Sequence, residues 1–297
     1  MRTINDFKVL SNFRQVVHKY EAFIIDIWGV LWDGIEPYQN SIDSLKKLIS
    51  LKKHIILLSN APRRSQVVSK RLESIGIDNS FYHKIISSGE ICRLKFLKNQ
   101  ELIKKIGYSY YFIGQQQDHT ITELLNLSKT YNIKEANFLL VCGTRNFEDT
   151  LNDYTEELDL ALKYKIPLIC ANPDKVVIRK TGDLLICAGA MADYYKKKGG
   201  VVYQYGKPFL DTYRICFEHL SKTNMGIKKN NILCIGDSLE TDILGANKFG
   251  LESLFIVNGI HKNQLNSNGS IISEVYLKKF FDKKKIVPDY VLEEFIF

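Results

Sequence analysis

Short apolar runs alternate with amphipathic segments along most of the chain, and this alternation predicts its elements. The apolar runs are bounded by turn residues, as is typical of buried strands, and lie at 23–27, 54–58, 85–86, 231–236 and 254–257. Helices are predicted between them, at 41–51, 62–75, 88–102, from 209 to about 222, and in a segment that ends at Gly250. Strand, helix and strand in this order favour a parallel sheet with right-handed crossovers. The sequence therefore predicts an α/β fold.

The pattern changes between residues 108 and 202. Strand candidates at 110–113, 138–142, 168–170 and 184–186 are interleaved with helix candidates at 118–129, 148–164 and 188–198. With a hairpin near 176–186, they would form a compact α+β unit of roughly a hundred residues, the size of a small domain. Core-type strands resume after Tyr203, so we predict an inserted domain at 104–202 and a core domain made of 1–103 plus 203–297.

Two segments near the ends of the chain are assigned by pattern alone. Residues 5–19 are predicted to form a helix that packs on the sheet, because their apolar residues keep helical spacing. Residues 261–270 are rich in Asn, Ser and Gly and are the best candidate for disorder.

Composition narrows the class of partner and the compartment. Lys plus Arg exceeds Asp plus Glu by 41 − 33 = 8, but the lysines are scattered in pairs and triplets, which favours a small anionic substrate over nucleic acid. Six cysteines without metal-type spacing indicate a reduced compartment. No run approaches the length of a membrane span, so we predict a cytoplasmic protein without a membrane partner. The sequence leaves the oligomeric state open, a homodimer included.

Polar residues follow three of the predicted strands. Asp26 lies near the end of the run at 23–27, Ser59 and Asn60 follow the run at 54–58, and Asp237 follows Gly236. In an open α/β sheet, ligands bind beyond the carboxyl ends of the strands, so these side chains are candidates for one site. A single strand-end Asp more often caps the next turn, and Ser59 could equally be part of an N-cap rather than an anion site. The recurrence at three strand ends favours a site.

Two neighbouring carboxylates call for a cation, and Mg²⁺ is the natural choice because it takes oxygen ligands together with substrate phosphate. Lys207 would add a fixed positive charge, and Ser59 with nearby amides would complete a pocket for a phosphoryl group. Asp26 could then attack phosphorus to give an aspartyl phosphate. Arg63, near the start of the helix at 62–75, could reach the substrate, although a solvated arginine is the plain alternative. No glycine-rich P-loop is present in the sequence.

Four motifs resemble, in order and spacing, those of haloacid dehalogenase-like (HAD) hydrolases, and the likeness is greatest to the NagD-like branch, subfamily IIA. They are Asp26-x-Trp28-Gly29-Val30-Leu31, Leu58-Ser59-Asn60, Gly206-Lys207-Pro208 and Gly236-Asp237-Ser238-x-x-x-Asp242. The Ala171-Asn172-Pro173-Asp174 stretch and Gly189-Ala190 also look like the cap domain of that branch. The resemblance spans nearly the whole chain and implies a Rossmann-like core with an inserted cap.

The resemblance also implies roles for individual residues. Asp26 would be the nucleophile and a Mg²⁺ ligand, the backbone carbonyl of Trp28 a second ligand and Asp237 a third, while Asp242 would support the ion through its water shell. Lys207 would neutralise the phosphate and orient Asp26. The expected contacts to phosphate or substrate are Ser59, Asn60, Arg63, Asn172 and Asp174.

One position departs from the family pattern. HAD phosphatases carry a second Asp two residues after the nucleophile, which protonates the leaving group, and this chain has Trp28 there. Indole cannot exchange a proton at neutral pH, and general acid–base assistance contributes about 10²- to 10⁴-fold. Asp33 or Asp174 could supply the acid instead. The function predicted is a phosphatase for a small phosphorylated metabolite such as a sugar phosphate or nucleotide, and the alternative is a weakly active or inactive phosphometabolite-binding protein.

Overall fold

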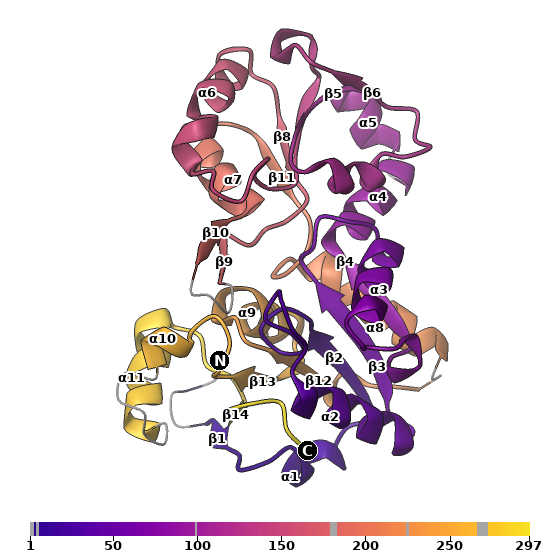
Figure 1. Ribbon diagram of the computed structural model, residues 1–297, viewed down its shortest axis with the longest axis vertical. Helices are drawn as coiled ribbons and strands as arrows, with labels where there is room; N and C mark the ends of the chain where they lie inside the picture. The colour runs from indigo at the N-terminus through magenta and orange to yellow at the C-terminus, as the bar shows by residue number, and fades with distance from the viewer. Residues whose placement is uncertain (1–2, 4–5, 99, 179–182, 224–225, 266–272) are drawn as a thin grey trace. The chain divides into compact units, whose positions relative to one another are not determined.

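The computed structural model describes residues 3, 6–98, 100–178, 183–223, 226–265 and 273–297. The chain forms two compact units (Figure 1). The first consists of Met1–Ser59, Ser69–Ile86 and Leu210–Phe297, and the second of Asn60–Val68 and Ser87–Phe209. We describe each unit by itself. These packing units do not test the domain boundaries expected at 103/104 and 202/203, which stay predictions.

The first unit is built around one seven-stranded sheet. In spatial order its strands are β1 (Lys8–Val9), β14 (Tyr290–Leu292), β13 (Glu252–Ile256), β12 (Ile232–Gly236), β2 (Ala22–Asp26), β3 (His54–Ser59) and β4 (Lys84–Ser87). The pairs from β1 through β3 are parallel. Without the edge strand β1, the six strands follow the chain in the order 3-2-1-4-5-6, which is the Rossmann order. The predicted α/β class is confirmed.

Helices connect these strands. They are α1 (Arg14–Val17), α2 (Gln39–Ser50), α3 (Ser65–Ser74), whose residues from Ser69 on belong to this unit, α8 (Leu210–Thr223), α9 (Leu244–Phe249), α10 (Lys262–Leu265) and α11 (Glu274–Lys284). The central strands β2 and β12 are buried along their whole length, as expected for a sheet covered on both faces. Their continuous apolar sequences therefore reflect burial rather than membrane insertion. Within the described residues, no helix combines the length and apolar character needed to cross a bilayer.

The N-terminal segment differs from the helix predicted at 5–19. The described part of it contains strand β1 and the short helix α1 instead. Strand β1 pairs with β14, and Phe13 packs edge-on against Phe295 with ring centroids 5.3 Å apart. Helical spacing was misleading here because the C-terminal segment offers both a strand edge and an aromatic partner, and neither is visible in local sequence.

The second unit has a five-stranded sheet that is parallel throughout. In spatial order its strands are β11 (Val202–Gln204), β8 (Leu168–Cys170), β7 (Phe138–Val141), β5 (Ser109–Ile113) and β6 (Ser128–Thr130). The helices of this unit are α4 (Ser88–Lys98), α5 (Gln100–Ile106), α6 (Thr155–Lys163) and α7 (Ala188–Lys197). The predicted hairpin is present as the antiparallel pair β9 (Val176–Ile178) and β10 (Leu184–Ile186).

Two predictions in this unit are wrong. The helix expected at 118–129 is a 3₁₀ helix, η2 (Gln116–Ile121), followed by strand β6. The segment 201–205, taken as a core strand, contains β11, which pairs with β8 of this second sheet. The first error arose because the apolar residues of 118–129 fit a helical pattern. The second arose because the sequence of a short strand does not show which sheet it joins. Of the loop proposed as disordered at 261–270, residues 266–270 lie outside the described part of the chain.

Candidate active site

Three buried carboxylates meet in the first unit. Asp26, Asp237 and Asp242 each offer an oxygen, and these oxygens all lie within 4.8 Å of one another. The three residues are buried, with exposed fractions of only 7%, 4% and 5%. Like charges at this distance and burial repel strongly unless a cation or a proton compensates them. The cluster therefore has the electrostatics of a cation site.

The topology of the sheet brings two of these residues together. Ile25 of β2 pairs with Ile235 of β12. Asp26 lies one residue beyond this pair on β2, and Asp237 lies two residues beyond it after β12. Strands β2 and β12 are neighbours at the point where the strand order reverses, and ligands bind there in open α/β sheets. The predicted convergence of Asp26 and Asp237 is thus seen in the fold.

A tight turn returns Asp242 to the same place. Residues Leu239–Ile243 form one turn of π-helix, and the amide of Ser238 donates to Asp242 Oδ2 at 3.3 Å. Tyr213 of α8 braces this turn, because its hydroxyl donates to the backbone carbonyls of Thr241 and Asp242, both at 3.1 Å. Burial, with the nearby Asp242 carboxylate, raises the pKa of Tyr213 well above its usual value, so its hydroxyl stays a donor.

Glycines make room for Asp237. A Cβ on Gly29 would lie 2.0 Å from Asp237 Oδ2, and a Cβ on Gly259 would lie 2.1 Å from the same atom. The amide of Ile260 donates to Asp237 Oδ2 at 2.6 Å and fixes the carboxylate from that side. Gly29 also has a φ of +83°, which glycine adopts without strain. The backbone is thus shaped around this carboxylate.

The donor set fits a hard divalent cation. Carboxylate oxygens are the protein ligands that Mg²⁺ accepts, usually one or two of them together with water and substrate phosphate. Burial raises the pKa of the nearby Tyr38 to about 12, and the charges of Asp33 and Asp237 act in the same direction. Within the described residues, no other group of three potential ligands was found.

Trp28 occupies the position at which the resemblance to HAD hydrolases leads us to expect a proton donor. Its indole lies edge-on to Trp32, with ring centroids 5.3 Å apart, and a Cβ on Gly34 would meet the indole at 2.5 Å. Asp33, one of the two alternative acids, is buried and accepts the amides of Ile35 and Glu36 at 2.9 and 2.8 Å. The Asp33 carboxylate therefore stabilises the turn that follows the two indoles.

Several predicted phosphate-binding residues gather in the second unit. Asn60 Nδ2 donates to Asp174 Oδ1 at 2.8 Å and to the carbonyl of Lys207 at 3.2 Å, and Asn60 Oδ1 accepts the amide of Lys207 at 2.7 Å. Asn172 Oδ1 accepts the amide of Asp174 at 3.1 Å. The Asn60 side chain thus holds the backbone of the segment that carries Lys207, which is only 2% exposed.

Ser59, which ends β3, belongs to the first unit, as do Asp26, Asp237 and Asp242. Asn60, Asn172, Asp174 and Lys207 belong to the second. The convergence of Lys207 with the carboxylates stays a prediction.

Arg63 is held by a residue that the sequence did not single out. Its Nε lies 2.7 Å from Asp118 Oδ1, and Asp118 Oδ2 accepts the amide of Gln115 at 3.2 Å. Burial raises the pKa of Asp118, and the neighbouring Arg63 acts in the opposite direction. The Arg63 side chain keeps 29% of its surface exposed. The spacing Gln115-x-x-Asp118 is a capping-box pattern at a helix start and was the available signal for Asp118.

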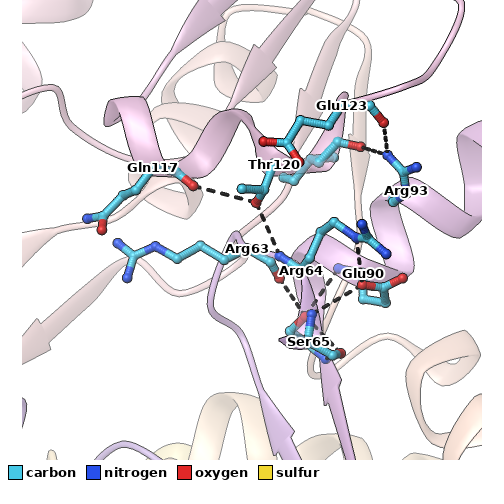
Figure 2. Close-up of polar contacts among 10 residues, drawn as sticks. Arg63, Arg64, Ser65, Glu90, Arg93, Gln117, Thr120 and Glu123 are labelled. Carbon is cyan, nitrogen blue, oxygen red and sulfur yellow. Dashed lines mark hydrogen bonds and ion pairs between the residues drawn. The ribbon is translucent and has the colours of Figure 1, made fainter. Parts of the chain in front are cut away.

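The segment that carries Arg63 is tied to helix α4 and to the turn after β5 by polar contacts (Figure 2). Arg64 Nε lies 3.4 Å from Glu90 Oε2, and the same oxygen accepts the amide of Ser65 at 3.1 Å. The amide of Arg64 donates to Thr120 Oγ1 at 3.5 Å. A Cβ on Gly89 would overlap the backbone of Arg63, so the two segments are in direct contact. These contacts fix the backbone that presents Arg63.

The chain is similar to known proteins in both sequence and fold. Residues 23–155 match the family described as haloacid dehalogenase-like hydrolase, and residues 204–294 match a second HAD-hydrolase family. The sugar-phosphatase AraL of Bacillus subtilis is 24% identical over 92% of this chain and 89% of its own length. The ribonucleotide monophosphatase NagD of Escherichia coli is 24% identical over 80% of this chain and 87% of its own.

Among solved structures, a haloacid dehalogenase-like hydrolase from Brucella suis superposes with a TM-score of 0.83 at 28% identity, covering 97% of this chain and 100% of its own.

Proposed function

The chain belongs to the haloacid dehalogenase-like hydrolase family, in its NagD-like branch (subfamily IIA), and from this premise we propose that it is a Mg²⁺-dependent phosphatase for a small phosphorylated metabolite. The observation that carries the proposal is the cluster of Asp26, Asp237 and Asp242 at the reversal point of the sheet. Relatives named as a sugar phosphatase and a ribonucleotide monophosphatase support a sugar phosphate or a nucleotide as substrate. A cytoplasmic location and a homodimeric state remain predictions.

Asp26 is the proposed nucleophile. One of its carboxylate oxygens attacks phosphorus, the bond from phosphorus to the ester oxygen breaks, and the alcohol leaves with a proton taken from a general acid or from solvent. Water then cleaves the aspartyl phosphate, releases inorganic phosphate and restores the carboxylate. A bound Mg²⁺ would offset the charge of the three carboxylates and of the phosphoryl oxygens. Asp26 and Asp237, the latter fixed by Ile260 and the two glycines, would hold that ion together with the backbone carbonyl of Trp28. Asp242, fixed by the π-turn, would support the ion through its water shell.

The other motif residues receive proposed roles in binding phosphate or substrate. Lys207 would offset the phosphate charge, since a buried ammonium group gains most from a nearby anion. Asn60 and Asp174 would act by holding the Lys207 segment, as their hydrogen bonds support. Ser59, Arg63 and Asn172 are the remaining candidates for contacts to the substrate.

Trp28 limits the range of substrates under this proposal. Without a proton donor at this position, ester oxygens of low basicity leave most readily, because they need no protonation in the transition state. Aryl phosphates and acyl phosphates should therefore be turned over faster than alkyl phosphates. Asp33, committed to two backbone amides, is not proposed as a replacement acid.

The test of the proposal is turnover with and without the nucleophile. Purified protein is assayed for inorganic phosphate release from sugar phosphates, nucleotides and aryl phosphates, with Mg²⁺ and with EDTA. We expect Mg²⁺-dependent release from at least one substrate, abolished in Asp26→Asn and retained in Asp43→Asn, where the Asp43 carboxylate lies on the surface near Lys46. Absence of turnover across the panel would refute the phosphatase proposal.

A phosphometabolite-binding protein with little turnover is the second candidate, and the replacement of the proton donor by Trp28 is the observation that favours it. Trp28→Asp distinguishes the two candidates, with Trp28→Asn as a control of the same size that removes the indole without adding an acid. An increase in kcat of about 10²-fold or more in Trp28→Asp alone would show a competent site that lacks only an acid. If both variants stay inactive while a ligand raises Tm and is recovered intact, the binding function is favoured.

A further inference from the structure

The sheet of the second unit has a reversal point of its own. In spatial order its strands are β6, β5, β7, β8 and β11, which is the chain order 2-1-3-4-5, and every pair is parallel. This is the flavodoxin-like order, in which ligands bind beyond the carboxyl ends of the strands at the reversal between the first and third. Here that place is beyond the ends of β5 and β7.

A cavity of about 240 Å³ lies at this place. Gly114, Gln116 and His119 follow the end of β5, Tyr131 follows β6, and Arg145 follows β7. Three neighbouring parallel strands therefore direct their C-terminal loops into one cavity, which we call the switch-point pocket. All its lining residues belong to the second unit.

Lys129 brings a positive charge to the pocket. Its Nζ lies 3.1 Å from His119 Nε2, 4.8 Å from the ring centroid of Tyr131 and 5.6 Å from that of Phe112. Within the described part of the chain, no carboxylate lies within ion-pair distance of Lys129. The His119 ring packs on Phe112 with centroids 3.9 Å apart, and burial with the Lys129 charge lowers the pKa of His119. His119 is thus neutral at pH 7 and accepts from the ammonium group, which keeps its charge uncompensated.

The other cation of the pocket is already balanced. Arg145 Nη2 lies 2.7 Å from Glu157 Oε2 and 3.4 Å from the hydroxyl of Tyr111. Tyr131, by contrast, is 85% exposed. The pocket thus combines one uncompensated ammonium group with an open aromatic ring directly beside it.

We propose that the switch-point pocket binds a small phosphate monoester that carries a planar ring, with the phosphate on Lys129 and the ring on Tyr131. An ammonium group next to apolar ring faces binds a phosphoryl group through charge-assisted hydrogen bonds. An exposed tyrosine ring offers a stacking surface worth about 1–3 kcal/mol to a nucleobase. The cavity is too small for a large ligand, since drug-sized pockets start at about 300 Å³. A nucleoside monophosphate or an aryl phosphate has the required combination of groups.

The experiment measures binding by isothermal titration calorimetry on the whole chain in EDTA, where the three carboxylates of the first unit lack a cation and disfavour phosphate. The probes are AMP and inorganic phosphate, and recovery of intact AMP is checked after each titration. Lys129→Gln should weaken AMP binding by about tenfold or more and abolish measurable binding of inorganic phosphate, because one charge-assisted contact is lost. Tyr131→Ala should weaken AMP by about tenfold while leaving phosphate unchanged.

Matched controls lie in the same unit. Lys104→Gln removes an exposed lysine that pairs with Glu101, and Tyr108→Ala removes another exposed tyrosine. Both should bind the probes as the unsubstituted chain does. Equal AMP affinity in Lys129→Gln and the unsubstituted chain would overturn the proposal, as would an equal loss in Lys104→Gln. Because turnover is not measured, failure of the pocket proposal leaves the phosphatase proposal untouched.

Discussion

The crowding around Asp237 gives the sharpest test of the carboxylate site. A Cβ on Gly29 would lie 2.0 Å from Asp237 Oδ2 and 2.6 Å from its Cγ. Real Cβ contacts are not shorter than 3.0 Å, so Gly29→Ala must displace the carboxylate oxygen by at least 3.0 − 2.0 = 1.0 Å. A displacement of this size at a reacting centre costs about 10²-fold in rate. We therefore expect Gly29→Ala to lose about 10²-fold in kcat/KM and to need more Mg²⁺ for half-maximal activity.

The backbone of Gly29 adds a second effect that has to be separated from the first. Its φ of +83° would strain alanine by about 1–2 kcal/mol. Gly76, in the same unit, has a φ of +86° and nothing within 4 Å of its Cβ position. Gly76→Ala therefore carries the backbone strain without the collision with Asp237.

The assay compares both variants by thermal unfolding and by Mg²⁺ titration of phosphate release. Both should unfold several degrees below the unsubstituted chain, at about 2–4 °C per kcal/mol. Only Gly29→Ala should lose activity and Mg²⁺ affinity. If the two variants agree within about twofold in kcat/KM and in the Mg²⁺ requirement, the position of the Asp237 carboxylate does not control catalysis, and the proposed role of the cluster is wrong.

Three further predictions concern stability. The hydrogen bond to His261 lowers the pKa of Glu240 from 4.5 to about 2. The contribution of Glu240 to the free energy of unfolding is therefore complete above pH 4.5 and is lost as the pH falls toward 2. In urea titrations across that window, Glu240→Gln should lose less free energy of unfolding than the unsubstituted chain. Burial lowers the pKa of His83 from 6.5, so the stability that neutral His83 contributes is lost as the pH falls below 6.5. His83→Asn keeps an acceptor for the amide of Ile55, and its Tm should drop less between about pH 7.5 and about pH 5.5 than the Tm of the unsubstituted chain. An equal drop would count against this assignment. Asp118→Asn removes the charged partner of Arg63 and should lower the free energy of unfolding by about 1–3 kcal/mol in urea titrations, whereas no change would mean that the pair is dispensable.

The central strands were predictable because their sequences reflect burial directly. Continuous apolar runs ending in Asp26 and Gly236 fit only strands covered on both faces, and their ends marked the site. Strands β1 and β14 were missed because each is only two or three residues long, and β1 takes its partner β14 from the other end of the chain. Segment 118–129 was misassigned because its apolar residues fit a helical pattern while its end pairs as β6 with β5.

The site was predictable in its residue types and not in its supporting contacts. Motif spacing identified Asp237 and Asp242, yet the need for glycine at 29 and 259 follows from distances that only the fold sets. Asp118 was missed because the partner of Arg63 lies 55 residues away in the chain. Lys129 and Tyr131 belong to no sequence motif, and only the order of the strands around them shows that they line one pocket.

The split of the first unit along the chain governs the order in which its parts can be assembled on the ribosome. Asp26 emerges 211 residues before Asp237, as 237 − 26 shows, and the second unit's long segment, Ser87–Phe209, is translated between them. At about 5–20 residues per second, nascent β2 therefore waits roughly 10–40 seconds for its neighbour β12. During that interval β2 lacks its neighbour β12, and the apolar side chains of β2 and β3 stay partly uncovered until β12, β13 and β14 have been translated.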